Sequence, residues 1–171
     1  MNKKFLDYSL LNGILPEKGT ILAAVSGGID SMVMLSLYLE AGIKPAVAHC
    51  NFSLRDSESD GDEELVRKFA MQKGLVFHSV KFDTREYAAA NKLSIQMAAR
   101  ELRYNWFEEI RQKNGYASVA VAHNLNDNAE TFFINLLRGT GINGLTGMKP
   151  KNGNIIRPLL FASRDEIAGY A

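Results

Sequence analysis

The sequence has one cysteine and no long apolar run, and each absence excludes a class of protein. A lone thiol, Cys50, cannot form an internal disulfide or a four-cysteine metal site, and it is typical of a reducing compartment. No apolar stretch approaches the roughly 20 residues that a transmembrane helix needs. Residues 1–11 mix charged and apolar side chains, unlike a secretory signal. We therefore expect a cytoplasmic protein with no membrane partner.

An excess of charge of one sign is also missing. Lys and Arg number 20 and Asp and Glu number 19, so the net charge of +1 does not by itself indicate a nucleic-acid-binding surface. The 171 residues are 46% hydrophobic and 23% charged, which suits one domain with a full-sized core. A helix that begins near Ser163 stops at Ala171 after about two turns, so we expect a truncated chain. The oligomeric state stays open.

Short apolar runs alternate with helical patterns along the chain. The predicted strands are 20–25, 44–50, 75–80, 118–122 and a short fifth one at 155–156. The predicted helices are 31–41, 56–73, 94–113 and 126–138. This alternation indicates an α/β fold, a twisted parallel sheet of about five strands with helices on both faces. Residues 149–154 are expected to form a loop.

A glycine turn joins the first predicted strand to the first predicted helix. Its sequence is Ser26-Gly27-Gly28-Ile29-Asp30-Ser31. Two glycines let backbone amides approach a ligand closely, and the helix start adds free N–H groups and the positive end of a dipole. The turn has neither the Gly-Lys-Ser/Thr of a Walker loop nor the spacing of the dinucleotide fingerprint. It predicts an anion site of a different kind.

Asp30 is the unusual residue of this turn. A carboxylate beside bound phosphates repels them unless a metal intervenes, so Asp30 indicates magnesium and chemistry at the phosphate chain. The structural alternative is a simple glycine turn in which Asp30 favours the helix dipole. The complete string between a strand and a helix favours the phosphate site.

The turn resembles the S-G-G-x-D-S loop of the pyrophosphatase-loop ATPases, which break ATP between the α- and β-phosphates and activate a substrate as an adenylate. Five further segments, in the expected order, resemble the N-terminal catalytic domain of the tRNA(Ile)-lysidine synthetases. They are HCNFSLR at 49–55, ARELRY at 99–104, AHNLNDNAET at 122–131, RGTGINGLTGM at 138–148 and IRPLL at 156–160. Phe52 and Asn124 depart from this pattern, because that family has histidine at both places.

Three charged side chains join Asp30 as candidate catalytic residues. Asp127 and Glu130 share one face of a predicted first helical turn. They are either acids that favour the dipole, with Asn124 as the cap, or functional groups. The resemblance implies that they help hold magnesium or a lysine amino group. It also implies that Arg103 is an ATP or lysine contact, the alternative being a solvated helix arginine.

The resemblance implies a wider ATP-binding set. His123 ends the fourth predicted strand, where ligands gather. For His123 and His49 a structural role stays equally open, and 139–141 could be a simple helix C-cap. The acidic run 56–64 is expected to be solvated, without chemistry. The predicted ATP contacts are Ser26, Gly27, Gly28, Ile29, Asp30, Ser31, His49, Asn51, His123, Gly139, Thr140 and Gly141, with Asp30 and Asp127 as magnesium ligands.

The resemblance finally implies an activity for residues 1–171, as an ATP-binding catalytic domain without the C-terminal tRNA-binding domains of that family. ATP would adenylate the oxygen at carbon 2 of the wobble cytidine of an isoleucine tRNA, and free lysine would displace AMP to give lysidine. Two alternatives stay open. One is another enzyme of the superfamily such as a tRNA thiolase, against which the lone Cys50 argues, and the other is a non-catalytic ATP-binding module.

Overall fold

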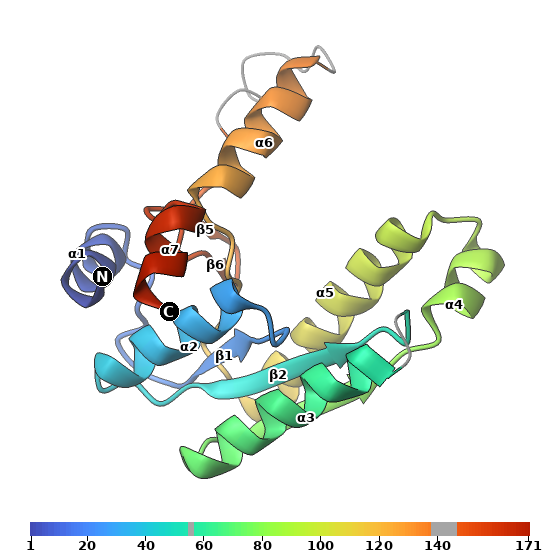
Figure 1. Cartoon of the computed structure of the whole chain (residues 1–171), viewed down its shortest axis with the longest axis horizontal. Helices are drawn as coiled ribbons and strands as arrows, with labels where there is room; N and C mark the ends of the chain where they lie inside the picture. Colours follow the sequence, from blue (N-terminus) through green and yellow to red (C-terminus); the bar gives the residue numbers. More distant parts are fainter. Residues whose placement is uncertain (55–56, 138–146) are drawn as a thin grey trace.

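A six-stranded sheet forms the centre of the computed structural model, which describes residues 1–54, 57–137 and 147–171. The strand order is β3-β2-β1-β4-β6-β5, and every neighbouring pair is parallel except β5 and β6. Four of these strands, β1, β2, β5 and β6, are labelled in Figure 1. The strands are β1 Ile21–Ala24, β2 Ala46–Asn51, β3 Phe77–Lys81, β4 Ser118–Ala120, β5 Lys151–Asn152 and β6 Ile155–Ile156. The predicted α/β fold is confirmed.

Helices connect most of the strands. They are α1 Asn2–Leu11, α2 Ile29–Glu40, α3 Ser57–Gln72, α4 Thr84–Asn91, α5 Ile95–Asn114, α6 Leu125–Leu137 and α7 Arg164–Tyr170. The sequence predicted α2, α3, α5, α6 and the start of α7, where Ser163 and Glu166 form the capping box. It did not predict α1 and α4. Only Thr84 and Ala88 of α4 are buried, so this helix has hardly any apolar face to recognise.

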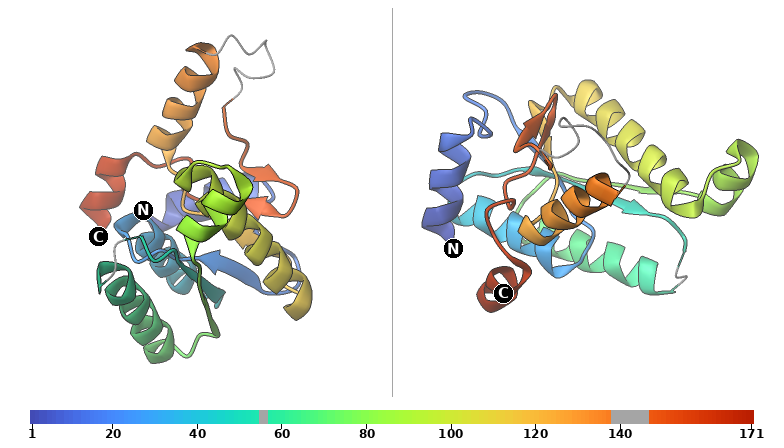
Figure 2. Two further views of the ribbon diagram at one scale, coloured as in Figure 1. Left: turned by 90° about the vertical axis from the view of Figure 1, so that its right-hand side faces the viewer. Right: turned by 90° about the horizontal axis from the view of Figure 1, so that it is seen from above.

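Side chains that alternate along the strands pack into two separate hydrophobic cores, one on each face of the sheet. Ile21 and Ala23 of β1 join the core under α1, α2, α3 and α7, whereas Leu22 between them joins the core under α5. Figure 2 shows α5 on one side of the sheet and α2 and α3 on the other. Helices on both faces are therefore confirmed, and they leave the ends of the strands accessible.

One prediction about the irregular segments is wrong. Residues 149–154, expected as a loop, include β5, which turns at Gly153 (φ 57°) and pairs antiparallel with β6. Lys151 and Asn152 are both exposed, so no apolar alternation could identify this strand. The antiparallel pair gives the sheet a mixed edge beyond the parallel part.

The helix α6 differs from the others because it projects from the body (Figures 1 and 2). None of its described residues is buried. Its base is held by the segment that leads into α7, because Leu125 donates its backbone N–H to Ala162 O at 2.9 Å, and α7 itself packs on α2. Among the described residues, no helix is both long enough and apolar enough to cross a membrane.

Candidate functional site

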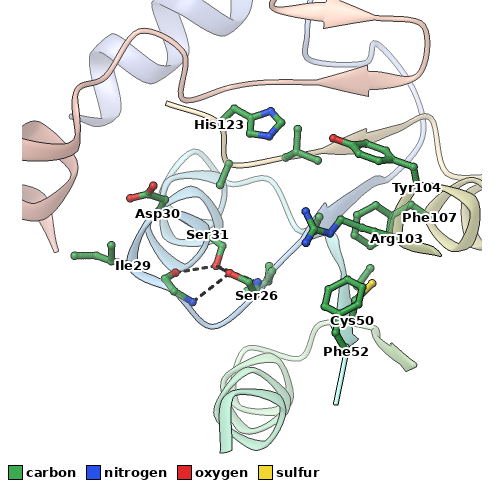
Figure 3. Close-up of a pocket in the computed structure, with 16 residues that line it drawn as sticks. Ser26, Ile29, Asp30, Ser31, Cys50, Phe52, Arg103, Tyr104, Phe107 and His123 are labelled. Carbon is green, nitrogen blue, oxygen red and sulfur yellow. Dashed lines mark hydrogen bonds between the residues drawn. The ribbon is translucent and has the colours of Figure 1, made fainter. Parts of the chain in front are cut away.

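A cavity of about 420 Å³ opens at the carboxyl ends of β1, β2 and β4. The strand order reverses between β1 and β4, and ligands of open α/β sheets bind at such a point. Side chains from the glycine turn, β2, α5 and the residues after β4 surround the cavity (Figure 3). Its lining is Ala24, Val25, Ser26, Gly28, Ile29, Asp30, Ser31, Ala48, Cys50, Phe52, Arg103, Tyr104, Phe107, Val121, Ala122 and His123.

The glycine turn is held in shape by its own two serines. Ser31 donates its hydroxyl to Gly28 O at 2.8 Å and accepts the backbone N–H of Ser26 at 3.1 Å. No side chain caps the start of α2 at Gly28. The first N–H groups of a helix have no intrahelical partners, so this uncapped start at the cavity suits an anionic ligand. Gly27 has φ 94°, a conformation that favours glycine.

Asp30 lies at the cavity, as the sequence predicted, and its carboxylate has a partner from a distant segment. Asn124 donates its side-chain amide to Asp30 Oδ2 at 2.9 Å. The same amide group caps α6, because Asn124 Oδ1 accepts the backbone N–H of Asp127 at 3.0 Å. Capping by Asn124 is thereby confirmed. It does not exclude a functional role for the acids that follow.

Asp127 and Glu130 lie side by side on α6 and share one cation. Arg164 of α7 donates to Asp127 Oδ1 at 2.6 Å and to Glu130 Oε1 at 3.0 Å. Asp127 Oδ2 accepts the backbone N–H of Asn124 at 3.1 Å. The sequence did not predict Arg164 here, because it lies 34 and 37 residues from the two acids. The acids are thus oriented by internal partners, and neither of them lines the cavity.

Arg103 points into the cavity from α5 (Figure 3). Its guanidinium carbon lies 5.1 Å from the centre of the Phe52 ring, in a cation–π contact. Phe52 in turn stacks on Phe82, with ring centres 5.8 Å apart. The aromatic ring that replaces a histidine therefore supports the arginine on one side. Arg100, by contrast, lies against Tyr104 on the exposed side of α5.

His123 lines the cavity as a neutral ring. Burial, with Arg157 next in importance, lowers the pKa of His123 to about 4. Arg157 donates its Nε–H to His123 Nδ1 at 3.2 Å, so the ring hydrogen resides on Nε2. The nitrogen that carries this hydrogen is a donor suited to an anionic or carbonyl ligand.

Two predicted nucleotide contacts have internal partners instead. His49 is 2% exposed, and its Nδ1 lies 2.9 Å from Val25 O. Asn51 donates to Asp60 at 2.7 Å and to Glu63 at 3.3 Å. Neither side chain lines the cavity, so their predicted contact with a nucleotide stays a prediction. Gly139, Thr140 and Gly141 lie outside the described residues.

Most described acids of the acidic run are exposed, as the sequence predicted, but two of them lie against neighbouring segments. Asp60 pairs with Lys81 at 2.8 Å, besides accepting from Asn51. Asp62 lies against the glycine turn, so that a β-carbon added at Gly27 would meet it at 3.2 Å. No local pattern indicates this approach, because the contact joins two segments that follow different strands. Asp62 is an additional carboxylate beside the predicted anion site.

The remaining polar groups limit the chemistry of the site. Burial raises the pKa of the Cys50 thiol to about 12, so this group stays protonated and is not a nucleophile near neutral pH. His78 is hydrogen-bonded to Tyr116 at 2.8 Å and lies outside the cavity lining. Within the described ranges, no group of three or more His, Cys, Asp or Glu could hold a metal ion by itself. Asp30 remains the carboxylate that the glycine turn itself carries.

Comparison with protein families identifies this arrangement. A family described as the PP-loop domain, whose members bind ATP, matches residues 3–171. The chain belongs to the PP-loop family. Membership explains the glycine turn between β1 and α2 and supports the use of ATP by this PP-loop domain.

Individual relatives are also similar to this PP-loop domain. A tRNA(Ile)-lysidine synthase from Bacteroides thetaiotaomicron is 49% identical over 150 residues, which cover 88% of this chain and 35% of that protein. One from Chlorobaculum tepidum is 43% identical over 172 residues, which cover 98% of this chain and 52% of that protein. The chain spans about a third of the length of the first curated relatives that it matches.

Solved structures share the fold at lower identity. A U34-tRNA thiolase from Methanococcus maripaludis has a TM-score of 0.77 at 21% identity, over 98% of this chain and 61% of that chain. An NH3-dependent NAD synthetase from Campylobacter jejuni has a TM-score of 0.65 at 14% identity, over 98% of this chain and 69% of that chain. These likenesses establish the fold alone.

Proposed function

We propose that this chain is the ATP-using catalytic domain of an enzyme that attaches free lysine to carbon 2 of the wobble cytidine in an isoleucine tRNA. The observation that carries this proposal is one connected site. Asn124 links Asp30 at the cavity to Asp127, and Arg164 links Asp127 to Glu130. The relatives named tRNA(Ile)-lysidine synthase at 43–49% identity support this choice of substrate.

The glycine turn would bind the phosphates of ATP. Its open amides and the positive end of α2 offset the charge of the pyrophosphate that leaves when the cytidine oxygen is adenylated. Asp30, at the cavity, would be the carboxylate ligand on the magnesium side of the phosphates, and Asp127 would join it by exchanging its bond to Arg164 for one to the metal. Magnesium would supply positive charge that screens these carboxylates from the phosphates.

Arg103 and His123 would hold the activated group. Arg103 is a fixed cation in the cavity wall, suited to a phosphate or carboxylate oxygen. The Nε2–H of neutral His123 adds a second donor. Phe107 and Val121 line the same cavity with apolar surface, which suits an aromatic base.

The acidic pair would bind the lysine amino group. Asp127 and Glu130 already hold one cationic side chain, that of Arg164, so their spacing suits a positively charged nitrogen. Lysine attacks only as the free amine, and one of these carboxylates would accept its proton. The amine then forms the new carbon–nitrogen bond as the bond to the adenylate oxygen breaks and AMP leaves.

We further propose that residues 1–171 supply the chemistry while parts of the longer protein bind the tRNA. The chain matches only about a third of the first relatives, and its net charge is +1. Both facts support tRNA contacts beyond this domain. The single cysteine of the chain, Cys50, supports a reducing cytoplasmic setting.

The test is incorporation of labelled lysine into an isoleucine tRNA with a CAU anticodon, with ATP and magnesium, by the full-length protein. We expect incorporation that Asp30→Ala reduces at least about a hundredfold, since the metal-side carboxylate is lost. Asp83→Ala, which removes only the cap of α4, is the control and should stay active. ATP binding without lysine incorporation would instead favour a thiolase or a non-catalytic module.

A further inference from the structure

Asn124 occupies an unusual place between two carboxylate-bearing helix starts. It is fully buried, with 0% of its surface exposed. Its Nδ2 donates to Asp30 Oδ2 at 2.9 Å, across 94 residues of sequence. Its Oδ1 accepts from the backbone N–H of Asp127 at 3.0 Å, and its own backbone N–H donates to Asp127 Oδ2 at 3.1 Å. Both ends of the carboxamide are therefore used.

The two bonds differ in what they contribute. The bond from Oδ1 is an ordinary helix cap, which serine or aspartate also makes. The bond to Asp30 goes to an ionised group and comes from a buried residue, and such charge-assisted bonds are worth roughly twice a neutral one. Since the cap can be kept while the link to Asp30 is lost, the two roles can be separated by substitution.

We infer that Asn124 is a positioning residue, which fixes the carboxylate of Asp30 relative to the start of α6. The inference rests on the proposed function, in which Asp30 lies on the magnesium side of the phosphates. Asn124 thereby joins the glycine turn to the start of α6 by its side chain, in addition to the backbone bond from Leu125 to Ala162 that holds the base of α6. Without this side chain, Asp30 would be free to turn to other rotamers.

The arrangement also accounts for the residue type. A group at this position must present one donor and one acceptor in the same side chain, at a distance of several bonds from the backbone. Asparagine does so, and so does neutral histidine with its two ring nitrogens. Serine has an acceptor for the cap, but its hydroxyl is too short to reach a carboxylate that lies beyond the carboxamide.

Three variants test the inference in the purified 171-residue chain. Asn124→Ser keeps a cap for α6 and removes the donor to Asp30. Asn124→His keeps a donor and an acceptor. Asp83→Ala, which removes the cap bond to Glu86 N in α4, is a matched control that loses one helix cap outside the cavity lining. For each chain, ATP affinity is measured by calorimetry with magnesium and with a chelator, and stability by denaturant titration.

We expect magnesium to tighten ATP binding in the unmodified chain and in Asp83→Ala. In Asn124→Ser this gain should fall by about tenfold, the amount expected for a lost hydrogen bond to a charged group. In Asn124→His most of the gain should return. A merely structural role would lower stability in Asn124→Ser and leave the gain from magnesium unchanged, which would overturn the inference.

A double-mutant cycle on the free energy of unfolding tests the bond between Asn124 and Asp30 without ATP. The loss caused by Asp30→Ala should be smaller in the Asn124→Ser background than in the unmodified chain, because the partner is already gone. Additive losses would show that the two residues are not coupled and would refute the inference. If the unmodified chain binds no ATP, or the full-length protein attaches no lysine, the proposed function fails, whereas the double-mutant cycle still measures the coupling between Asn124 and Asp30.

Discussion

The starts of α2 and α6 both carry carboxylates at the same edge of the sheet, but their backbone amides are used differently. No side chain caps α2, and the serines of its glycine turn bind within the turn. The start of α6 is closed by the reciprocal bonds of Asn124 and Asp127. Arg164 then neutralises the acids of α6 from outside.

The two helix starts therefore suit different ligands. The open start of α2 leaves its electrostatic attraction for a ligand. At the start of α6 the bonds between Asn124 and Asp127 already occupy the N–H groups of both residues. The carboxylates there are therefore held in a fixed orientation. A phosphate can therefore bind α2 directly, whereas a cation at α6 must share the acids with an arginine.

The largest expected effect is a dependence of stability on pH, and it comes from His123, the residue before the cap of α6. The pKa of His123 falls from about 6.5 in the unfolded chain to about 4 in the folded one, through burial and Arg157. Its contribution to stability is full above pH 6.5 and is lost as the pH falls to 4, on the order of 3 kcal/mol. Denaturant titrations across this range should show that loss.

The control for this effect is His123→Gln, which does not titrate but can still accept from Arg157. The unfolding free energies of the two chains should converge as the pH falls below 6.5. A constant difference between them from pH 7 to 4 would show that His123 is not held neutral. The other histidines are present in both chains and cancel.

The next effect concerns the turn that keeps the α2 start open. Gly27→Ala forces a side chain into φ 94° and places its β-carbon 3.2 Å from Asp62. We expect a cost of roughly 1–2 kcal/mol in the free energy of unfolding. Gly28→Ala is the matched control, because Gly28 has φ −71° and its nearest neighbour, Ser26 Oγ, lies 3.5 Å away. Equal stability of the two variants would contradict the strained turn.

The smallest effect on stability belongs to the cation at α6. The Arg164 side chain is 50% exposed, so Arg164→Gln should cost below about 1 kcal/mol. In the full-length protein it should lower KM for lysine about fivefold, because the lysine ammonium no longer shares the two acids with an arginine, and leave KM for ATP unchanged. Lys4→Gln breaks the exposed ion pair between Lys4 of α1 and Glu166, which lies in α7 like Arg164. It should change neither KM for lysine nor KM for ATP. Equal KM values for lysine in both variants would remove Arg164 from the site.

The parts of the molecule that the sequence predicts are those with local signals. The strands and the helices α2, α3 and α5 follow from apolar periodicity, and the start of α7 follows from the cap at Ser163. The strand β5 and the helix α4 escape because their residues are mostly exposed, so that no periodic apolar face marks them. The glycine turn was predictable because its function is encoded in consecutive residues.

The side-chain partners of the site were not predictable in the same way. Asn124 meets Asp30 across 94 residues, and Arg157 meets His123 across 34. Asp62 approaches Gly27 only because α3 passes the turn. Such contacts depend on how strands are ordered in the sheet, which a single sequence does not specify residue by residue. The sequence supplied candidate residues for the site, and the fold determined which of them meet.

The projecting helix α6 has a mechanical consequence. Its 13 residues make a rod about 20 Å long whose described residues are all unburied, so its direction is set at its base. A tilt of about 10° there would move the far end by about 3 Å. The base contains Asp127, is capped by Asn124 and is contacted by Arg164, so a small rotation beside the cavity would become a larger displacement far outside it. The far end of α6 would therefore move more than its base when the contacts of Asn124, Asp127 and Arg164 change.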